Sequence, residues 1–272
     1  MDAIQGAGIG LRNPHFKDIL GCQQTSLWFE VLADNFVIDG GLNLDLLMAV
    51  AERYPTVLHG VGLSIGSVSP LDWDYLQKLR KLMDGIGAKW YSEHISFCAD
   101  GEVQLPDLLP MPFNQESLAH LVDRVKAVQD YMGQPMLLEN ISSYIQSPHN
   151  SLFEADFIAQ LLEKADCYLL LDLNNLYVCS YNHGFNPIDY LNSLPLDRIK
   201  QVHLAGHEHR SHYLLDSHGC PIAEPVWDLF TRLINMAGPI PAMVEWDNHL
   251  PDFKALLEQA QRINQILNIR EP

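Results

Sequence analysis

The sequence predicts a (β/α)8 barrel, the TIM-barrel fold class in which eight parallel strands close into a cylinder inside a ring of helices. The chain has 272 residues, which is within the range of one such barrel. Short apolar runs rich in Val, Ile, Leu and aromatic residues alternate with longer segments of helical period, as βα units require. No internal repeat, charge block or low-complexity tract marks a boundary, so we expect a single domain over residues 1–272.

Eight apolar runs have the length and composition of buried strands. In chain order they cover residues 6–11, 26–32, 56–62, 88–95, 135–141, 167–175, 199–204 and 241–247. Segments of helical period cover residues 13–21, 43–54, 70–86, 115–132, 152–165 and 252–267. The segment 43–54 illustrates the pattern, because its apolar residues fall on one helical face, namely Leu44, Leu47, Met48 and Ala51. The proline-rich segment 106–112 is interpreted as a stiff connector rather than as a wall of the barrel mouth.

Charge and cysteine usage narrow the function classes. The formal net charge of −17 repels a phosphate backbone, so we expect no nucleic acid partner. The first residues lack a basic region followed by an apolar core, and no uninterrupted apolar run approaches about 18 residues. We therefore expect a cytoplasmic protein that does not enter a membrane. The five cysteines form no Cys-x-x-Cys pair, so they are interpreted as buried or incidental thiols.

Six of the predicted strands carry a histidine or an acidic residue near their carboxyl end. The six residues are His59, His94, Glu139, Asp172, His203 and Glu245. Because the carboxyl ends of barrel strands ring a single mouth, we expect these side chains to converge there. Asn175 follows three positions after Asp172, and Asp216 and His218 lie in a Gly-flanked loop over the same rim. For any one of these residues, the alternative is a capped strand end or a hydrogen-bonded core histidine.

This set of histidines, carboxylates and an amide offers too many ligands for one ion and suits two or three. Glu139 is the natural bridge, because each of its two oxygens can bind a different cation. Without a thiolate ligand, the set favours iron, manganese or zinc over copper(I). Such a cluster either activates water for hydrolysis or, if the metal is iron, binds a substrate heteroatom and dioxygen at open positions.

The order of these residues resembles the ligand order of the trinuclear zinc barrels in the endonuclease IV and xylose isomerase-like superfamily. One position departs from the nuclease pattern, because this chain has Asn175 where the nucleases have a histidine. Over about residues 6–265 the chain more closely resembles the multinuclear non-haem iron-dependent oxidases, which include the methanobactin-type peptide oxidases. The motifs that carry this resemblance are Gly8-Ile-Gly-Leu-Arg12, Trp28-Phe-Glu-Val-Leu, Leu58-His-Gly-Val, Ser92-Glu-His-Ile-Ser, Leu138-Glu-Asn-Ile, Leu171-Asp-Leu-Asn-Asn and His203-Leu-Ala-Gly-His207.

The resemblance implies a cofactor of two or three iron ions, Fe2+ or Fe3+, ahead of zinc or manganese. It implies one iron held by His59, His94 and Glu139. Glu139 would bridge to a second iron held by Asp172, His203 and Glu245. A third ion would be held by Asn175, Asp216 and His218.

Within this set, we expect Glu139, Asp172 and His203 to be the catalytic residues. Three further residues are expected to orient the ligands through hydrogen bonds, namely Glu93, Asn140 and His207.

The resemblance further implies an oxidase that uses dioxygen to modify cysteine in a ribosomally synthesised precursor peptide, which a partner protein presents. One alternative is a divalent-metal sugar isomerase or epimerase, or an endonuclease IV-like hydrolase, on the same barrel. Asn175 and the acidic composition argue against the nuclease, and no lysine suited to proton transfer is evident at a strand end. A non-catalytic module for copper or iron handling is a third possibility, but it would not need so many ligands.

Overall fold

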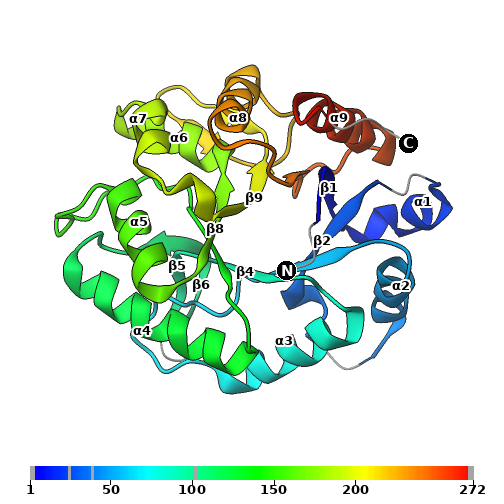
Figure 1. Ribbon diagram of the computed structural model, residues 1–272, viewed down its shortest axis with the longest axis horizontal. Helices are drawn as coiled ribbons and strands as arrows, with labels where there is room; N and C mark the ends of the chain where they lie inside the picture. The colour runs from blue at the N-terminus through cyan, green and yellow to red at the C-terminus, as the bar shows by residue number, and fades with distance from the viewer. Residues whose placement is uncertain (1–3, 24–25, 38–39, 101–102, 269–272) are drawn as a thin grey trace.

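The computed structural model describes residues 4–23, 26–37, 40–100 and 103–268, and its eight parallel strands close into a barrel (Figure 1). Going round the cylinder, the strands are β1 (Ala7–Gly10), β2 (Trp28–Leu32), β3 (Thr56–His59), β4 (Tyr91–His94), β7 (Leu137–Glu139), β8 (Tyr168–Asp172), β9 (Ile199–Leu204) and β12 (Ala242–Val244), which pairs with β1. Each strand lies within one of the eight apolar runs, so the predicted fold class is confirmed.

Helices surround the cylinder (Figure 1). They are α1 (Phe16–Gly21), α2 (Leu42–Ala51), α3 (Trp73–Ile86), α4 (Gln115–Met132), α5 (Glu154–Ala165), α6 (Leu173–His183), α7 (Pro187–Ser193), α8 (Glu224–Ala237) and α9 (Phe253–Ile266), with 3-10 turns η1 (Asn13–His15), η2 (Ala33–Asn35) and η3 (Leu196–Arg198). In α4, the Asn114 side chain accepts a hydrogen bond from the Ser117 amide at 3.0 Å, and Gly133 ends the helix with a φ of 73°. In the described part of the chain, no helix has the length and apolar character needed to cross a bilayer.

Among the boundaries that differ from the sequence-based expectation, two change the type of element. The segment 13–21 is a 3-10 turn followed by the short helix α1 rather than one helix. The sixth strand was expected to reach residue 175, but β8 ends at Asp172. The Asp172 carboxylate accepts a hydrogen bond from the Asn175 amide at 2.6 Å and thereby caps α6. Asn175 therefore lies in the first turn of a helix.

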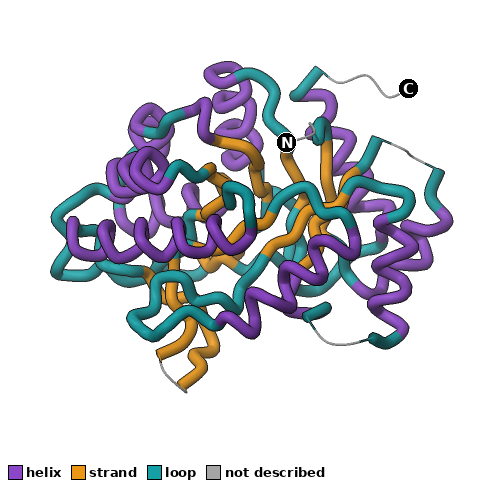
Figure 2. The backbone as a smooth tube through the Cα atoms, turned by 60° about the horizontal axis from the view of Figure 1, so that its bottom comes forward, coloured by secondary structure: helices purple, strands orange, loops and turns teal. Residues whose placement is uncertain are grey.

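Two hairpins lie outside the barrel ladder, one formed by β5 (Ser96–Asp100) and β6 (Val103–Pro110), the other by β10 (His207–His209) and β11 (Leu214–Asp216). Figure 2 shows the β5–β6 hairpin projecting from the body of the protein. The interpretation of 106–112 as a connector is wrong, because residues 106–110 belong to β6 and residues 107–110 line the barrel mouth. Proline is compatible with a strand at a sheet edge, where one side needs no N–H donor. Asp216 pairs with His207 across the second hairpin instead of lying in a loop.

The interior of the barrel is divided into an apolar floor and a polar mouth. The floor consists of Ile4, Trp28, Val57, Trp90, Leu137, Leu170 and Met243, all buried. On several strands a floor residue is followed two positions later by a polar residue, as in Val57 and His59 or Leu170 and Asp172. Successive strand side chains point to opposite faces, so this spacing places both members of each pair inside the barrel.

Gly8 is required by the floor, because a Cβ at this position would lie 2.4 Å from the indole of Trp28. We expect Gly8→Ala to lower the free energy of unfolding by about 1–3 kcal/mol through overpacking. Urea denaturation followed by circular dichroism measures this change. Gly85→Ala in α3, where the new Cβ meets nothing within 4 Å, is the matched control and should stabilise by about 0.5 kcal/mol. An unchanged midpoint for Gly8→Ala would contradict the expected overlap.

Candidate metal centre

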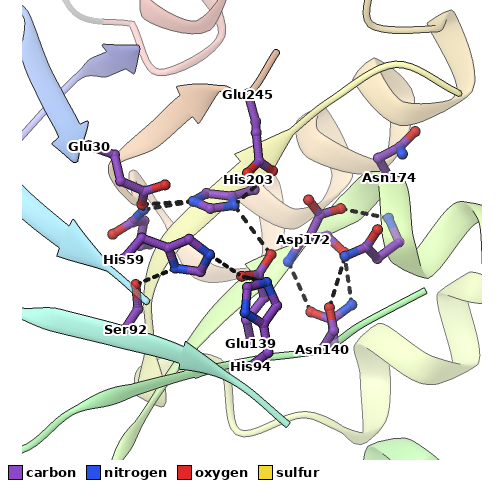
Figure 3. Close-up of polar contacts among 12 residues, drawn as sticks. Glu30, His59, Ser92, His94, Glu139, Asn140, Asp172, Asn174, His203 and Glu245 are labelled. Carbon is purple, nitrogen blue, oxygen red and sulfur yellow. Dashed lines mark hydrogen bonds and ion pairs between the residues drawn. The ribbon is translucent and has the colours of Figure 1, made fainter. Parts of the chain in front are cut away.

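The carboxyl ends of six barrel strands bring the predicted residues together at one mouth of the barrel, as Figure 3 shows. The residues are His59 on β3, His94 on β4, Glu139 on β7, Asp172 on β8, His203 on β9 and Glu245 directly after β12. Their exposed fractions range from 0% to 9%. Side chains that are distant in sequence therefore share one buried site.

Glu139 lies in the middle of this cluster. Its Oε2 atom is 3.3 Å from His59 Nε2 and 3.2 Å from His94 Nε2, and its Oε1 atom is 3.3 Å from His203 Nδ1. These contacts lack the alignment of hydrogen bonds, since Glu139 Oε2 and His203 Nδ1 are both buried atoms without a hydrogen-bond partner. The nitrogen and oxygen atoms approach a common region without bonding to one another, as the ligands of a cation do.

The other ring nitrogens of two histidines are already engaged. His94 Nδ1 is 3.1 Å from the Gly60 carbonyl oxygen, which can only accept, so this nitrogen carries the proton. His59 Nδ1 is 2.8 Å from Ser92 Oγ, whose hydroxyl donates to a backbone carbonyl at 3.2 Å. His59 Nδ1 is therefore also a donor. In the neutral ring, both Nε2 atoms present a lone pair toward Glu139, and a cation is needed between them.

A second group of potential ligands adjoins the first through Glu139. It contains Asp172, His203 and Glu245, whose ligand atoms and those of Glu139 all lie within 4.8 Å of one another. Glu245 Oε2 is 3.1 Å from His203 Nδ1 and has no hydrogen-bond partner. The Oδ1 atom of Asp172 caps α6, whereas its Oδ2 atom is buried and unpartnered. Buried carboxylate oxygens are costly without a partner, and a cation would satisfy them.

The residues expected around a third ion are brought together in part. His218 Nε2 is 2.7 Å from Asp216 Oδ1, and Asn175 Oδ1 is a buried atom without a partner. The opposite nitrogen, His218 Nδ1, is 3.2 Å from both Glu245 Oε2 and Asp247 Oδ2. His218 has a φ of 44°, in the left-handed region, so a sharp backbone turn presents its ring to these acids.

Dense packing of charges shifts several pKa values. Burial lowers the pKa of His94, but Glu139 and Glu93 outweigh this effect and raise it to about 9. Burial raises the pKa of Asp172 well above its ordinary value, and Glu139 and Glu245 act in the same direction against His218. For His59, burial and the neighbouring His94 and His203 lower the pKa. The carboxylates thus favour any cation, proton or metal, inside the cluster.

The three residues expected to orient ligands lie beside the cluster and form hydrogen bonds with its members or with their neighbours. Glu93 accepts a hydrogen bond from the His94 amide at 2.9 Å, and its Oε1 is 3.4 Å from His94 Nδ1. Asn140 exchanges two hydrogen bonds with the backbone of Asp172, at 2.9 and 3.0 Å. His207 contacts the site through Asn174. Its Nδ1 is 2.7 Å from Asn174 Oδ1, and the Asn174 amide donates to Asp216 at 2.7 Å.

A cavity of about 680 Å³ opens over the cluster. Its base includes His59, His94, Glu139 and Glu245, and its walls include Val61, Leu108, Tyr144 and Ile145. Among the residues that line it in the described chain there is no cysteine. The volume lies within the range of sites for small molecules or for a few residues of a peptide.

Sequence reasoning missed three residues at this site, namely Arg12, Glu30 and Asp247. Arg12 forms an ion pair with Asp247, which contacts His218. Glu30 is 3% exposed, and its Oε2 is 2.9 Å from His203 Nε2. Each could have been noticed as a charged residue in or just beyond an apolar run, as in Trp28-Phe-Glu-Val-Leu. Glu30 was passed over because it lies within its strand, and Arg12 and Asp247 because each follows the end of the observed strand, β1 or β12, by two or three positions.

The closed barrel, with a buried histidine and carboxylate cluster at its mouth, has the TIM-barrel fold of the xylose isomerase-like and endonuclease IV-like proteins. A D-tagatose 3-epimerase-like protein is similar with a TM-score of 0.61 and 12% identity, over 97% of this chain and 98% of that one. Endonuclease IV of Thermus thermophilus is similar with a TM-score of 0.54 and 13% identity, over 97% of each chain. At these identities the likeness extends to the fold alone.

The chain belongs to the family of RiPP precursor modification enzymes MbnB/TglH/ChrH, whose pattern matches residues 6–268. This finding confirms the family resemblance inferred from the motifs. A UPF0276 protein of Acaryochloris marina is 45% identical over 272 residues, covering 100% of this chain and 98% of the relative. A UPF0276 protein of Anaeromyxobacter is 41% identical over 263 residues, covering 97% and 93%. The family implies a peptide substrate.

Two substitutions of Asp172 separate its role as the cap of α6 from the effect of its buried charge. Asp172→Asn keeps an oxygen that can cap α6 and removes a buried charge, so metal-free protein should be at least as stable as wild type. Asp172→Ala removes the cap and should lower the free energy of unfolding by about 1 kcal/mol relative to Asp172→Asn. Urea denaturation in the presence of a chelator measures both. Equal destabilisation by the two variants would contradict a distinct capping role.

Proposed function

We propose that this protein is a multinuclear iron-dependent oxidase that uses dioxygen to modify cysteine residues of a ribosomally synthesised precursor peptide. The observation that carries the proposal is the position of Glu139 among His59, His94 and His203, with unpartnered oxygens of further acids beside it. Membership of a family that modifies precursor peptides supplies the class of substrate.

The contacts within the cluster support the ligand sets of this proposal. His59, His94 and Glu139 would hold one ion. Glu139, Asp172, His203 and Glu245 would hold a second, with Glu139 as the shared ligand. A third ion would be held around His218, with Asp216 and Asn175 as proposed from the sequence, or with Glu245 and Asp247 on the opposite ring nitrogen.

The donor set suits iron. Imidazole and carboxylate without thiolate is compatible with iron, manganese or zinc. Bound iron would supply the one-electron steps that oxidation by dioxygen requires, which Zn2+ lacks because it has no redox chemistry. In the proposed reaction the peptide cysteine loses electrons and dioxygen gains them. Glu139, Asp172 and His203 would be the catalytic residues, since they hold the ions against the substrate.

The cavity fits a thiol that arrives with the substrate. No cysteine is among its described lining residues, so the protein would not offer a competing thiol of its own. Apolar side chains such as Val61, Leu108 and Ile145 would exclude water from the bound peptide. The rim carries Tyr144, Ile145 and Tyr213 with 41% to 65% of their surface exposed, and a peptide-presenting partner protein would dock beside them.

The proposal is tested with protein purified anaerobically and analysed for metals. We expect about two or three equivalents of iron and consumption of dioxygen when a cysteine-containing peptide encoded beside the gene is added. Mass spectrometry of the peptide should report a change in mass that a cysteine-to-serine peptide does not undergo. Full occupancy by zinc, with cleavage of abasic DNA or epimerisation of a ketose, would contradict the proposed oxidase activity. It would support a hydrolase or an epimerase instead.

Glu139→Gln should affect both ligand groups at once, because Glu139 contacts all three histidines. We expect the variant to lose at least one equivalent of iron and to reduce peptide oxidation by about 100-fold or more. Glu258→Gln is the control, since Glu258 lies on α9 with a 65% exposed side chain. Wild-type iron content and activity in Glu139→Gln would contradict its bridging role.

A further inference from the structure

Beneath the cluster, four buried polar or aromatic side chains form a hydrogen-bonded chain inside the barrel. They are Trp90 just before β4, Gln201 and His203 on β9, and Glu30 on β2, with exposed fractions of 3%, 0%, 0% and 3%. Trp90 Nε1 lies 2.6 Å from Gln201 Oε1. Gln201 Nε2 contacts Glu30 Oε2. Glu30 Oε2 is 2.9 Å from His203 Nε2, and Figure 3 shows these two side chains facing each other.

The direction of each hydrogen bond follows from two groups, the Trp90 indole, which can only donate, and the Glu30 carboxylate, which can only accept. An indole N–H can only donate, so Trp90 requires an oxygen at Gln201 and thereby sets the orientation of that amide. The NH2 group of Gln201 then faces Glu30, and Glu30 must accept. Gln201 Nε2 also lies 3.0 Å from His203 Nε2, but a lone pair on His203 Nε2 would face the Glu30 oxygen at 2.9 Å and be repelled by it. His203 Nε2 therefore carries a proton and donates to Glu30.

The consequence lies on the opposite edge of the imidazole ring. With the proton on Nε2, the neutral ring of His203 has its lone pair on Nδ1. Nδ1 is 3.3 Å from Glu139 Oε1 and 3.1 Å from Glu245 Oε2, both acceptors. A lone pair between two carboxylate oxygens is repelled unless a cation lies among them. The hydrogen bonds that link Trp90, Gln201 and Glu30 therefore leave the Nδ1 lone pair of His203 directed at the place where a cation would bind.

We propose that Glu30, held by Gln201 and Trp90, is a positioning residue that fixes the tautomer of His203 and so sets the affinity of the metal site formed by Glu139, Asp172, His203 and Glu245. The inference rests on the metal centre of the proposed function. A histidine ligand whose second nitrogen donates to a carboxylate is oriented and made more basic by it. Glu30 is 3% exposed, so its charge does not contribute to the solubility of the protein. An apolar residue would fill the same space without the cost of a buried charge.

The test is an anaerobic titration of metal-free protein with Fe2+ against a chromophoric chelator, which resolves the affinity of each equivalent. Glu30→Gln preserves shape but removes the charge, and it should weaken one equivalent about 10-fold to 100-fold while leaving another unchanged. Trp90→Phe removes the N–H that orients Gln201 without touching the centre, and it should weaken the same equivalent about 3-fold. Trp28→Phe is the matched control, because Trp28 lies on the same apolar floor as Trp90. Its indole N–H donates to the Gly6 carbonyl oxygen and takes no part in the hydrogen bonds that lead to His203.

Thermal melting of each metal-free variant accompanies the titration, so that loss of folding is not scored as loss of affinity. Selective weakening of the same equivalent in Glu30→Gln and Trp90→Phe, with Trp28→Phe like wild type, supports the inference. Wild-type titrations for both variants overturn it while leaving the proposed function intact. An equal loss of affinity for every equivalent of iron in all three variants also overturns the inference. Wild-type protein that binds no iron overturns this inference and the proposed function together.

Discussion

The arrangement of the barrel mouth is governed by the cost of burying several carboxylates and imidazole lone pairs against one another. Glu139 is 1% exposed and Asp172 is fully buried, yet each has an oxygen without a hydrogen-bond partner. Buried charge is tolerated when it is paired or bound to a metal. The hydrogen bonds on the outer nitrogens of His59 and His94 leave their inner nitrogens facing these acids. The polar half of the barrel is therefore organised to receive cations.

The apolar half of the barrel supplies the rigidity that this arrangement needs. Trp28 and Trp90 pack with ring centroids 6.5 Å apart on the floor, and Val57, Leu170 and Met243 fill the remaining space. Floor and cluster share the same strands with a spacing of two residues, as in Met243 and Glu245. A shift of one residue in strand register would turn both sets out of the barrel. The packing of the floor thus fixes the direction of the side chains at the mouth.

The fold and much of the cluster could be predicted from sequence because both follow from strand periodicity. A buried parallel strand is a continuous apolar run, and a residue such as His203 at its carboxyl end must face the mouth. Glu30 could not be assigned in this way, because it lies inside β2 and its role depends on a contact with β9 across the barrel interior. The place of Asp247 at the site depends likewise on an ion pair with Arg12, which is 235 positions away in the chain and could not be inferred from local sequence. The end of β8 was misplaced because the predicted strand was continued through Leu173, Asn174 and Asn175, which the capping bond of Asp172 places in the first turn of α6.

The β5–β6 hairpin borders the cavity with residues 107–110 but contributes none of the histidines or acids of the cluster. It also lies outside the ladder that closes the cylinder. Substitutions in it can therefore change the border of the cavity without disturbing strand register or the buried acids. If the protein acts as proposed, exchange of this one element would change the wall against which a peptide lies and leave the buried acids and histidines beneath it in place.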